Sequence, residues 1–512
     1  MSSVISSELI RGSAKQAATE AWFRRFLVVV LAIAGLGVLC HFGMMLWAQH
    51  EFASPESVVA AQSTMLAHGG GLYYSLRAYP YTVTAYMPLF YGLEAGLLKT
   101  GLPVYQAGRL LSFAALLGIF ALVWRLLLLY TGERSYAWTG IALCASTSLL
   151  LSWGTVAQVD TLAVFFSVAG FYQYSRYAVR GEKTLLGAGA CVILAFFTKQ
   201  TAIACPAAIF LLLLFERPKV ALRFGAGVGG AALVLFLGIN TALHGSFIDN
   251  TILANLNPFA WEKLNQHLSY LLIASGQLVL VAGIGFTKAV RSPAKALFVY
   301  LALAMLVLVL TAPKIGSDSN YQVETTVALI LCACAALQAL DFFALLFRGS
   351  KSWVTLLLIP VALHLMLNFR ITGPLLIGRF VKERRFRQEV AALRPYLAGN
   401  GRAIATDMNA MAHLRGRLEV EPLIYTLLVD AGRIDPSRVR GDIAAGAFST
   451  IVLYQDLSRP FDPDPELRSL PEEQLNEIRK HYQLVQHIPG PYLDGVFVYK
   501  PVRGALPSLE AK

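Results

Sequence analysis

Long apolar runs alternate with short polar segments over the first 370 positions of this 512-residue chain. About 20 apolar residues are enough to cross roughly 30 Å of hydrocarbon as an α-helix. We therefore predict a polytopic α-helical membrane protein with about 11 spans. The expected spans are residues 25–48, 106–130, 135–152, 161–179, 184–198, 201–215, 222–242, 267–287, 295–312, 325–347 and 352–371.

The pattern changes after about residue 375, where charged residues become frequent and the apolar runs shorten. Short strands are predicted at 402–406 and, from an apolar run, at 449–454; 482–487 and 495–499 suggest a closing hairpin, and helices are expected at 407–414, 423–431 and 472–481. We expect a small C-terminal α/β soluble domain. The predicted organisation is a cytoplasmic N-terminal segment (1–24), a transmembrane domain (25–375) and a C-terminal domain (376–512).

The first loop between spans, residues 49–104, is long enough to hold structure of its own. Ser54 and Pro55 suit a helix start, with Glu56 in its first turn and a stop at the glycines 69–71. A second helix is expected over 87–99. It is too short to span, so we expect it along the interface or against the bundle.

Composition supports the membrane class: 56% of the residues are hydrophobic and 14% charged. The net charge of +12 is dispersed over short loops, which favours the positive-inside rule over nucleic-acid binding. This bias predicts an inner (plasma) membrane protein with a cytoplasmic N-terminus and an extracytoplasmic C-terminal domain. A basic cluster opposes that orientation, although long domains translocate largely regardless of charge; it comprises Arg379, Lys382, Arg384, Arg385 and Arg387.

Threading the spans through a membrane gathers another group of charged residues at the outer face. Charge next to hydrocarbon is costly and is usually functional. The group, at the opposite face from most of the clustered basic residues, is Glu51, Glu56, Asp160, Lys199, Lys314, Asp318 and Glu324.

Four short motifs in this group resemble the GT-C superfamily of membrane glycosyltransferases, in particular its RgtA/B/C/D-like or dolichyl-phosphate-mannose-protein mannosyltransferase-like branch. The resemblance covers roughly residues 25–370. The motifs are Ser54-Pro55-Glu56-Ser57 with the later Tyr86-Met87-Pro88-Leu89-Phe90-Tyr91, Gln158-Val159-Asp160, Phe197-Thr198-Lys199-Gln200-Thr201, and Lys314-Ile315-Gly316 through Asn320-Tyr321 to Glu324.

The resemblance implies an acidic residue in the first outer loop that acts on the acceptor. Many members of the superfamily place Asp there, whereas this chain has Glu56 after Pro55, with Glu51 nearby. We favour Glu56 as the general base, since a sugar or protein hydroxyl needs a carboxylate to take its proton. The alternative is a glutamate that only stabilises the start of a helix.

Asp160 and Lys199 each have a structural and a functional interpretation. Asp160 can cap a helix, orient the acceptor, or hold Mg²⁺ or Mn²⁺ together with Glu56. Lys199 can extend to the interface as a solvated lysine, or compensate the charge of a lipid-linked phosphate. Lys314 is the second candidate for the phosphate, and Arg77 and Arg109 rank lower.

The other candidates are expected to bind substrate. Asn320, Tyr321 and Glu324 precede or begin the tenth span and can hydrogen-bond a sugar, although Asn320 can equally cap a helix. Tyr86 belongs to a group of tyrosines in the first outer loop that suits an aromatic membrane belt or a sugar-stacking wall.

The leading hypothesis is a polyprenyl-phosphate-sugar-dependent glycosyltransferase, of hexosyl or pentosyl type, which transfers one sugar with inversion to an acceptor hydroxyl at the outer face. Its partners would be the lipid-linked donor, a glycan, lipid or protein acceptor, and membrane lipid, without nucleic acid. One alternative is a transporter or flippase of lipid-linked glycans, which predicts charges at the bilayer midplane and two related halves. The other is a membrane assembly scaffold in which the loop acids are dispensable.

Overall fold

The computed structural model describes residues 2–52, 54–347, 351–415, 417–462, 468, 470–490 and 494–502. Helices cover all eleven expected spans, but two of these spans, 135–152 and 325–347, are each divided into two helices. Among the described residues, five helical segments are long and apolar enough to cross a membrane by length and composition, and they are Val28–Trp47, Val104–Thr131, Pro218–Ala242, Trp261–Ala289 and Ser319–Ala339. Shorter apolar helices complete the bundle, so the chain is a multi-pass membrane protein.

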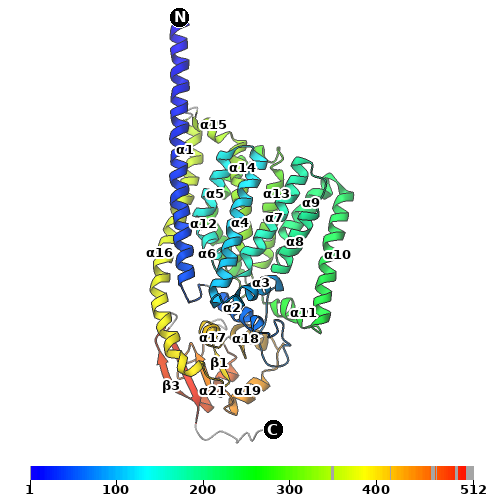
Figure 1. Cartoon of the computed structure of the whole chain (residues 1–512), viewed down its shortest axis with the longest axis vertical. Coiled ribbons are helices and arrows are strands. Elements are labelled where there is room, and N and C mark those ends of the chain that lie inside the picture. Colours follow the sequence, from blue (N-terminus) through cyan, green and yellow to red (C-terminus); the bar gives the residue numbers. More distant parts are fainter. Residues whose placement is uncertain are drawn as a thin grey trace.

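The bundle and the first outer loop are built from helices in chain order (Figure 1). These are α1 (Ser2–Trp47), α2 (Ser54–Ala67), α3 (Pro88–Leu98), α4 (Val104–Thr131), α5 (Arg134–Ser146), α6 (Ser148–Trp153), α7 (Val159–Arg180), α8 (Leu186–Thr198), α9 (Ala204–Glu216), α10 (Pro218–Ala242), α11 (Ser246–Thr251), α12 (Trp261–Ala289), α13 (Lys295–Thr311), α14 (Val323–Ala339), α15 (Phe342–Phe347) and α16 (Lys351–Leu397), with short 3₁₀ helices η1 (Leu253–Asn255) and η2 (Ser319–Gln322).

Local sequence explains several of these boundaries. α4 and α7 end where Gly132 and Gly181 adopt left-handed conformations, with φ of 72° and 70°, which glycine reaches without a steric penalty. α10 begins at Pro218, whose fixed φ suits the first helical turn. The two helices expected in the first outer loop are confirmed as α2 and α3.

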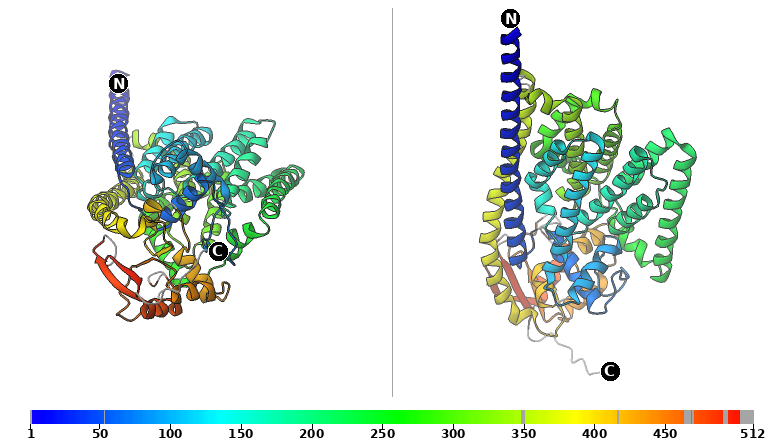
Figure 2. Two further views of the ribbon diagram at one scale, coloured as in Figure 1. Left: turned by 60° about the horizontal axis from the view of Figure 1, so that its bottom comes forward. Right: turned by 45° about the horizontal axis from the view of Figure 1, so that its top comes forward.

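α14 lies at the centre of the bundle, where it contacts α4, α5, α7, α12 and α13. In the apolar part of the segment Ser319–Ala339, which contains η2 and α14, 83% of the residues are buried. The corresponding share is 6% for α10, which lies at the edge of the bundle (Figure 2). The main apolar core surrounds α14. Elements that pack on α14 are therefore held rigidly, whereas α10 presents its apolar surface to lipid.

The C-terminal region contains α17 (Met408–Leu414), α18 (Pro422–Asp430), α19 (Ser437–Ala444) and α21 (Glu472–His481). Its sheet has the order β1-β2-β4-β3, formed by Ala403–Ala405, Thr450–Leu453, Val496–Pro501 and Tyr482–Ile488. β1 and β2 are parallel, and the other two pairs are antiparallel. The predicted α/β character and closing hairpin are confirmed, while α19 was not expected.

Two sets of contacts join the C-terminal region to the membrane bundle. The backbone of Tyr81, between α2 and α3, exchanges 2.8 Å hydrogen bonds with Glu419 and Glu421. Buried Glu383 of α16 accepts hydrogen bonds from the backbone amides of Gln49 and His50, just after α1. α16 itself continues through the expected domain boundary at residue 376 without a break. The first outer loop is thus held between the bundle and the C-terminal sheet (Figure 1).

Candidate active site

Glu56 lies in a fully buried ion pair with Arg109 of α4. Its Oε1 accepts from Nε of Arg109 at 2.8 Å, and its Oε2 accepts from the second guanidinium nitrogen at 2.9 Å. The backbone amides of Ala157 and Phe52 donate to the same two oxygens, at 2.8 and 2.9 Å. Both oxygens of Glu56 are therefore engaged on the protein side.

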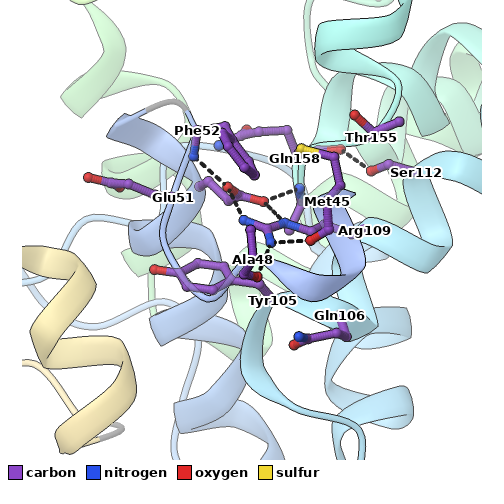
Figure 3. Close-up of polar contacts among 12 residues, drawn as sticks. Met45, Ala48, Glu51, Phe52, Tyr105, Gln106, Arg109, Ser112, Thr155 and Gln158 are labelled. Carbon is purple, nitrogen blue, oxygen red and sulfur yellow. Dashed lines mark hydrogen bonds and ion pairs between the residues drawn. The ribbon is translucent and has the colours of Figure 1, made fainter. Parts of the chain in front are cut away.

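Arg109 is equally well surrounded. Its remaining guanidinium hydrogens go to the backbone carbonyls of Met45, Ala48 and His50, each at 2.6 Å (Figure 3). The guanidinium also lies 4.9 Å from the ring of Phe52. A buried charge pair is tolerated when its other hydrogen-bonding capacity is satisfied, as it is here. The pair ties the end of α1, the start of α2 and the segment before α7 to one point on α4.

This geometry argues against Glu56 as the base that faces the acceptor. A general base needs an oxygen within hydrogen-bond reach of the hydroxyl, and both oxygens of Glu56 are already taken by Arg109 and two backbone amides. Its contacts support the structural alternative. Glu56 stabilises not only the start of α2 but also the meeting point of α1, α2, α4 and the segment before α7. Arg109, which ranked low from the sequence as a phosphate ligand, is the partner that holds Glu56.

Close packing beside this pair depends on a glycine of α4. A Cβ atom added at Gly108 would lie 2.3 Å from Oε1 of Glu94 and 2.5 Å from Cβ of Ala157. Glu94 of α3 is fully buried, and its other oxygen accepts a 2.6 Å hydrogen bond from Ser63. Burial raises the pKa of Glu94 to about 8, so this carboxyl stays protonated near neutral pH.

We expect Gly108→Ala to destabilise the protein by about 1–3 kcal/mol, because the new methyl group overlaps Glu94 and Ala157. The matched control is Gly96→Ala on α3, where an added Cβ meets nothing within 4 Å. That change should stabilise by about 0.5–1 kcal/mol through helix propensity. Unfolding titrations of both variants in detergent check this, and equal stabilities would contradict the close packing of Gly108 on α3.

A second charged pair forms where the chain enters α7. Nζ of Lys199, at the end of α8, lies 2.5 Å from Oδ1 of Asp160, and both side chains are buried. Lys199 is 5% exposed, so it does not extend to solvent as the structural alternative required. The N-cap position of α7 belongs to Gln158, and Asp160 lies in the first turn of the helix. The two residues are each other's partners, although 39 positions separate them.

Most of the other predicted substrate residues surround this pair. Nδ2 of Asn320 donates to Oδ2 of Asp160 at 3.0 Å, and Oδ1 of Asn320 has no partner among the described residues. Nζ of Lys199 lies 4.0 Å from the ring centre of Tyr321 and 5.8 Å from that of Tyr86. Asp318 caps η2, so Asn320 is not needed for that.

Asp160, Lys199, Asn320 and Tyr321 line a small cavity of about 30 Å³. Polar side chains of α7, α8 and η2 form one side, together with Glu324 of α14, which accepts a 2.7 Å hydrogen bond from Tyr300. α13 supplies an apolar side through Ala304, Val307 and Leu308. The cavity therefore joins a polar, charged wall to an apolar wall inside the bundle.

The structure does not bring every predicted residue to this cavity. Lys314 pairs through its backbone with Phe259 and does not line the cavity, and Arg77 is exposed in the first outer loop. Glu56 binds Arg109 instead. Asp160, Lys199, Asn320, Tyr321 and Glu324 line the cavity, and Tyr86 lies close to its lysine.

The suggested divalent cation does not fit the two carboxylates proposed for it. Glu56 already neutralises Arg109, and Asp160 already neutralises Lys199. Within the described ranges, no three His, Cys, Asp or Glu side chains form a group that could hold a metal ion.

Glu51, the alternative base, is buried and accepts a hydrogen bond from the Ser57 hydroxyl. Its side chain points away from Arg109 (Figure 3). Burial, together with the negative charges of Asp407 and Glu56, raises the pKa of Glu51 to about 8. Asp407 at the start of α17 is also buried, and its pKa is raised to about 6. The junction between the first outer loop and the C-terminal region thus holds carboxyls that resist ionisation.

This predicts a pH dependence of stability. Between about pH 4.5 and 8 folded Glu51 keeps a proton that the unfolded chain releases, so its stabilising contribution is present below pH 4.5 and is lost as the pH rises through 8. The slope from one group is at most about 1.4 kcal/mol per pH unit. Glu51→Gln should reduce the slope in unfolding titrations from pH 5 to 8 by up to this amount, while Asp407 and Glu94 continue to contribute. The control Glu472→Gln, at an exposed position, should leave the slope unchanged. A slope that is unchanged in Glu51→Gln would refute the assignment.

Comparisons with known proteins agree with this architecture. Residues 98–239 match the family model described as dolichyl-phosphate-mannose-protein mannosyltransferase. No curated protein matches the sequence.

Solved structures match over almost the whole chain. ArnT from Cupriavidus metallidurans bound to undecaprenyl phosphate has a TM-score of 0.61 at 14% identity, over 94% of this chain and 99% of that one. The Archaeoglobus fulgidus oligosaccharyltransferase tethered to an acceptor peptide has a TM-score of 0.57 at 12% identity, over 96% and 76%. The arabinofuranosyltransferase AftD from Mycobacteria has a TM-score of 0.50 at 15% identity, over 93% and 40%. The resemblance inferred from the sequence is confirmed, and the chain has the fold of the GT-C membrane glycosyltransferases.

Proposed function

We propose that this protein transfers a sugar from a polyprenyl-phosphate donor to an acceptor hydroxyl, with inversion at C1. The observation that carries the proposal is the buried Asp160–Lys199 pair in a cavity with one apolar wall. A lipid-linked phosphate needs a cation for its head and apolar surface for its chain. The structurally similar ArnT was solved with undecaprenyl phosphate, which supports this donor class.

Lys199 is the proposed cation for the donor phosphate. The cavity of about 30 Å³ holds about one water molecule, whereas ligand pockets are typically 300–1,000 Å³. Donor entry therefore requires the cavity to open, and the phosphate then replaces Asp160 as the partner of Lys199. In this arrangement donor binding and release of the carboxylate are one event.

Asp160, once released, is the proposed general base. It takes the proton of the acceptor hydroxyl, the acceptor oxygen forms a bond to C1 of the sugar, and the C1–O bond to phosphate breaks. The bonding electrons leave with the polyprenyl phosphate, whose charge Lys199 compensates in a site of low dielectric constant. Asn320, Tyr321, Glu324 and Tyr86 are the proposed sugar-binding residues.

We place the reaction at the membrane face that carries the C-terminal domain. The N-terminus of α1 and the C-terminal domain lie at opposite ends of the bundle (Figure 1), which supports their lying on opposite sides of the membrane. The basic residues of the short loops then favour a cytoplasmic N-terminus and an extracytoplasmic domain in an inner (plasma) membrane. The acceptor can then be a glycan, a lipid or a protein. The structurally similar oligosaccharyltransferase was solved with an acceptor peptide, which supports including proteins among the acceptors to be tested.

The test uses the full chain in proteoliposomes, first with undecaprenyl phosphate alone and then with labelled undecaprenyl-phosphate sugars and a panel of acceptors. We expect Lys199→Gln to weaken undecaprenyl phosphate binding by at least tenfold and to lower kcat/KM by about 10²-fold, the usual effect of losing an electrostatic stabiliser. Lys219→Gln, an exposed lysine in the first turn of α10, is the control and should leave both unchanged.

Equal binding and transfer by Lys199→Gln would remove the proposed phosphate site. Movement of labelled lipid-linked glycan across the membrane with no new glycosidic bond would instead identify a transporter. The transporter interpretation is less well supported. It predicts charges at the bilayer midplane, whereas Asp160 and Lys199 lie at the ends of α7 and α8.

A further inference from the structure

The basic cluster that opposed the predicted orientation divides into two sets in the structure. Arg379 and Arg387 make contacts inside the protein. Arg379 lies 4.4 Å from the ring of Phe52, and Nε of Arg387 lies 2.5 Å from Oε1 of Glu383. Arg384 and Arg385 are exposed on α16, and within the part of the chain that the structure describes neither forms an ion pair.

The two free arginines continue an apolar stripe along one face of α16. Residues three, four, seven and eight positions apart share a helix face. Ile377, Phe380 and Val381 are 70%, 61% and 52% exposed, and Arg384 and Arg385 follow them on the same face. The face changes from large apolar side chains to two cations within one helical turn, along the flank of the molecule beside α1 (Figures 1 and 2).

α1 marks the membrane level at which this change occurs. Its apolar span ends at Trp47, whose ring stacks on Phe380 with centroids 5.4 Å apart. At about 1.5 Å per residue, Arg384 lies about 6 Å further along the axis of α16. Bilayer headgroups occupy roughly 5–8 Å beyond the hydrocarbon on each side. The apolar stripe therefore ends in hydrocarbon, and the two guanidinium groups reach the phosphate layer.

We propose that Arg384 and Arg385 form a binding site for the phosphate of an anionic glycerophospholipid, in the leaflet on the side of the C-terminal domain. Ile377, Phe380 and Val381 contact its acyl chains, and the guanidinium groups donate hydrogen bonds to its phosphate, a geometry that suits arginine. The site is separate from the Lys199 cavity, and its occupant is a structural lipid, not the sugar donor.

The test measures lipid retention by the full chain. The protein is purified from mixed micelles with equal amounts of phosphatidylglycerol and phosphatidylcholine, and the bound lipids are counted by native mass spectrometry. We expect wild type to retain phosphatidylglycerol preferentially, and Arg384→Gln/Arg385→Gln to reduce that preference by roughly fivefold for each charge removed. Raising the salt concentration should weaken the wild-type preference.

The matched control is Arg394→Gln, which removes an exposed arginine from the same helix about 13 Å beyond the headgroup level. It should leave the lipid preference unchanged, and all three proteins should remain monodisperse with equal unfolding midpoints. An undiminished preference in the double variant, or an equal loss in Arg394→Gln, would overturn the proposal. So would a change of oligomeric mass at unchanged lipid retention, which would assign this face to a second copy of the chain.

Discussion

Replacing Arg109 by methionine should destabilise the protein by about 3–5 kcal/mol, the usual cost of leaving one partner of a buried ion pair without the other. Glu56 would keep its two backbone donors but would lose the guanidinium that neutralises it. The backbone carbonyls of Met45, in the last turn of α1, and of Ala48 and His50, just after it, would also lose their donor. An unfolding titration in detergent measures the change.

A double replacement separates the pair from its surroundings. Glu56→Met/Arg109→Met should recover much of the loss, because removing both charges leaves no uncompensated ion in the interior. Arg125→Met, at an exposed position of the same helix, should change stability by less than about 0.5 kcal/mol. If the single Arg109 variant is as stable as wild type, or the double variant is no better than the single, the structural role of this pair is wrong.

Asp160→Asn should lower kcat for sugar transfer by about 10²–10⁴-fold, the usual contribution of a positioned general base. Undecaprenyl phosphate should bind at least as tightly as it does to wild type, because Asn no longer competes with the phosphate for Lys199. Single-turnover assays with labelled donor, together with a binding titration, measure the two effects. The combination distinguishes a lost base from a lost binding site.

Two further variants serve as controls that distinguish the loss of the base from misfolding. Asp160→Glu keeps the charge that balances Lys199 and should retain measurable transfer, and Asp318→Asn changes an exposed carboxylate and should behave as wild type. Full activity in a folded Asp160→Asn protein would transfer the role of base to another carboxyl of the cavity, Glu324 being the candidate that lines it.

The membrane spans could be predicted because a helix in hydrocarbon needs an apolar run of known length. The strands Ala403–Ala405 and Thr450–Leu453 could be predicted from short apolar runs, and every residue of both strands is buried. α19 was missed because its sequence, Ser437–Ala444, is polar on most faces and only Val439 and Ile443 are buried. Short amphipathic helices of this kind carry a weak signal.

The candidate site was predicted as a set of residues but not as a set of pairs. Asp160 and Lys199 were both identified, yet their contact depends on how α7 packs against α8, which no local pattern encodes. Arg109 and Glu56 are 53 positions apart and meet through the docking of α2 on α4. Glu94 was overlooked inside an apolar helix. A single acidic residue in an apolar stretch could have identified it, because a buried carboxyl must either have a charged partner or keep its proton.

α16 has a consequence for how this chain can vary in length. It is one continuous helix of 47 residues that leaves the bundle and reaches the C-terminal sheet. Its buried contacts at Glu383, Phe386 and Glu389 repeat every three residues. Each residue added between them would turn the distal part by about 100°. Homologous chains should therefore lengthen or shorten α16 by whole helical turns. Any other change in its length would alter which surface of the C-terminal domain packs against the first outer loop.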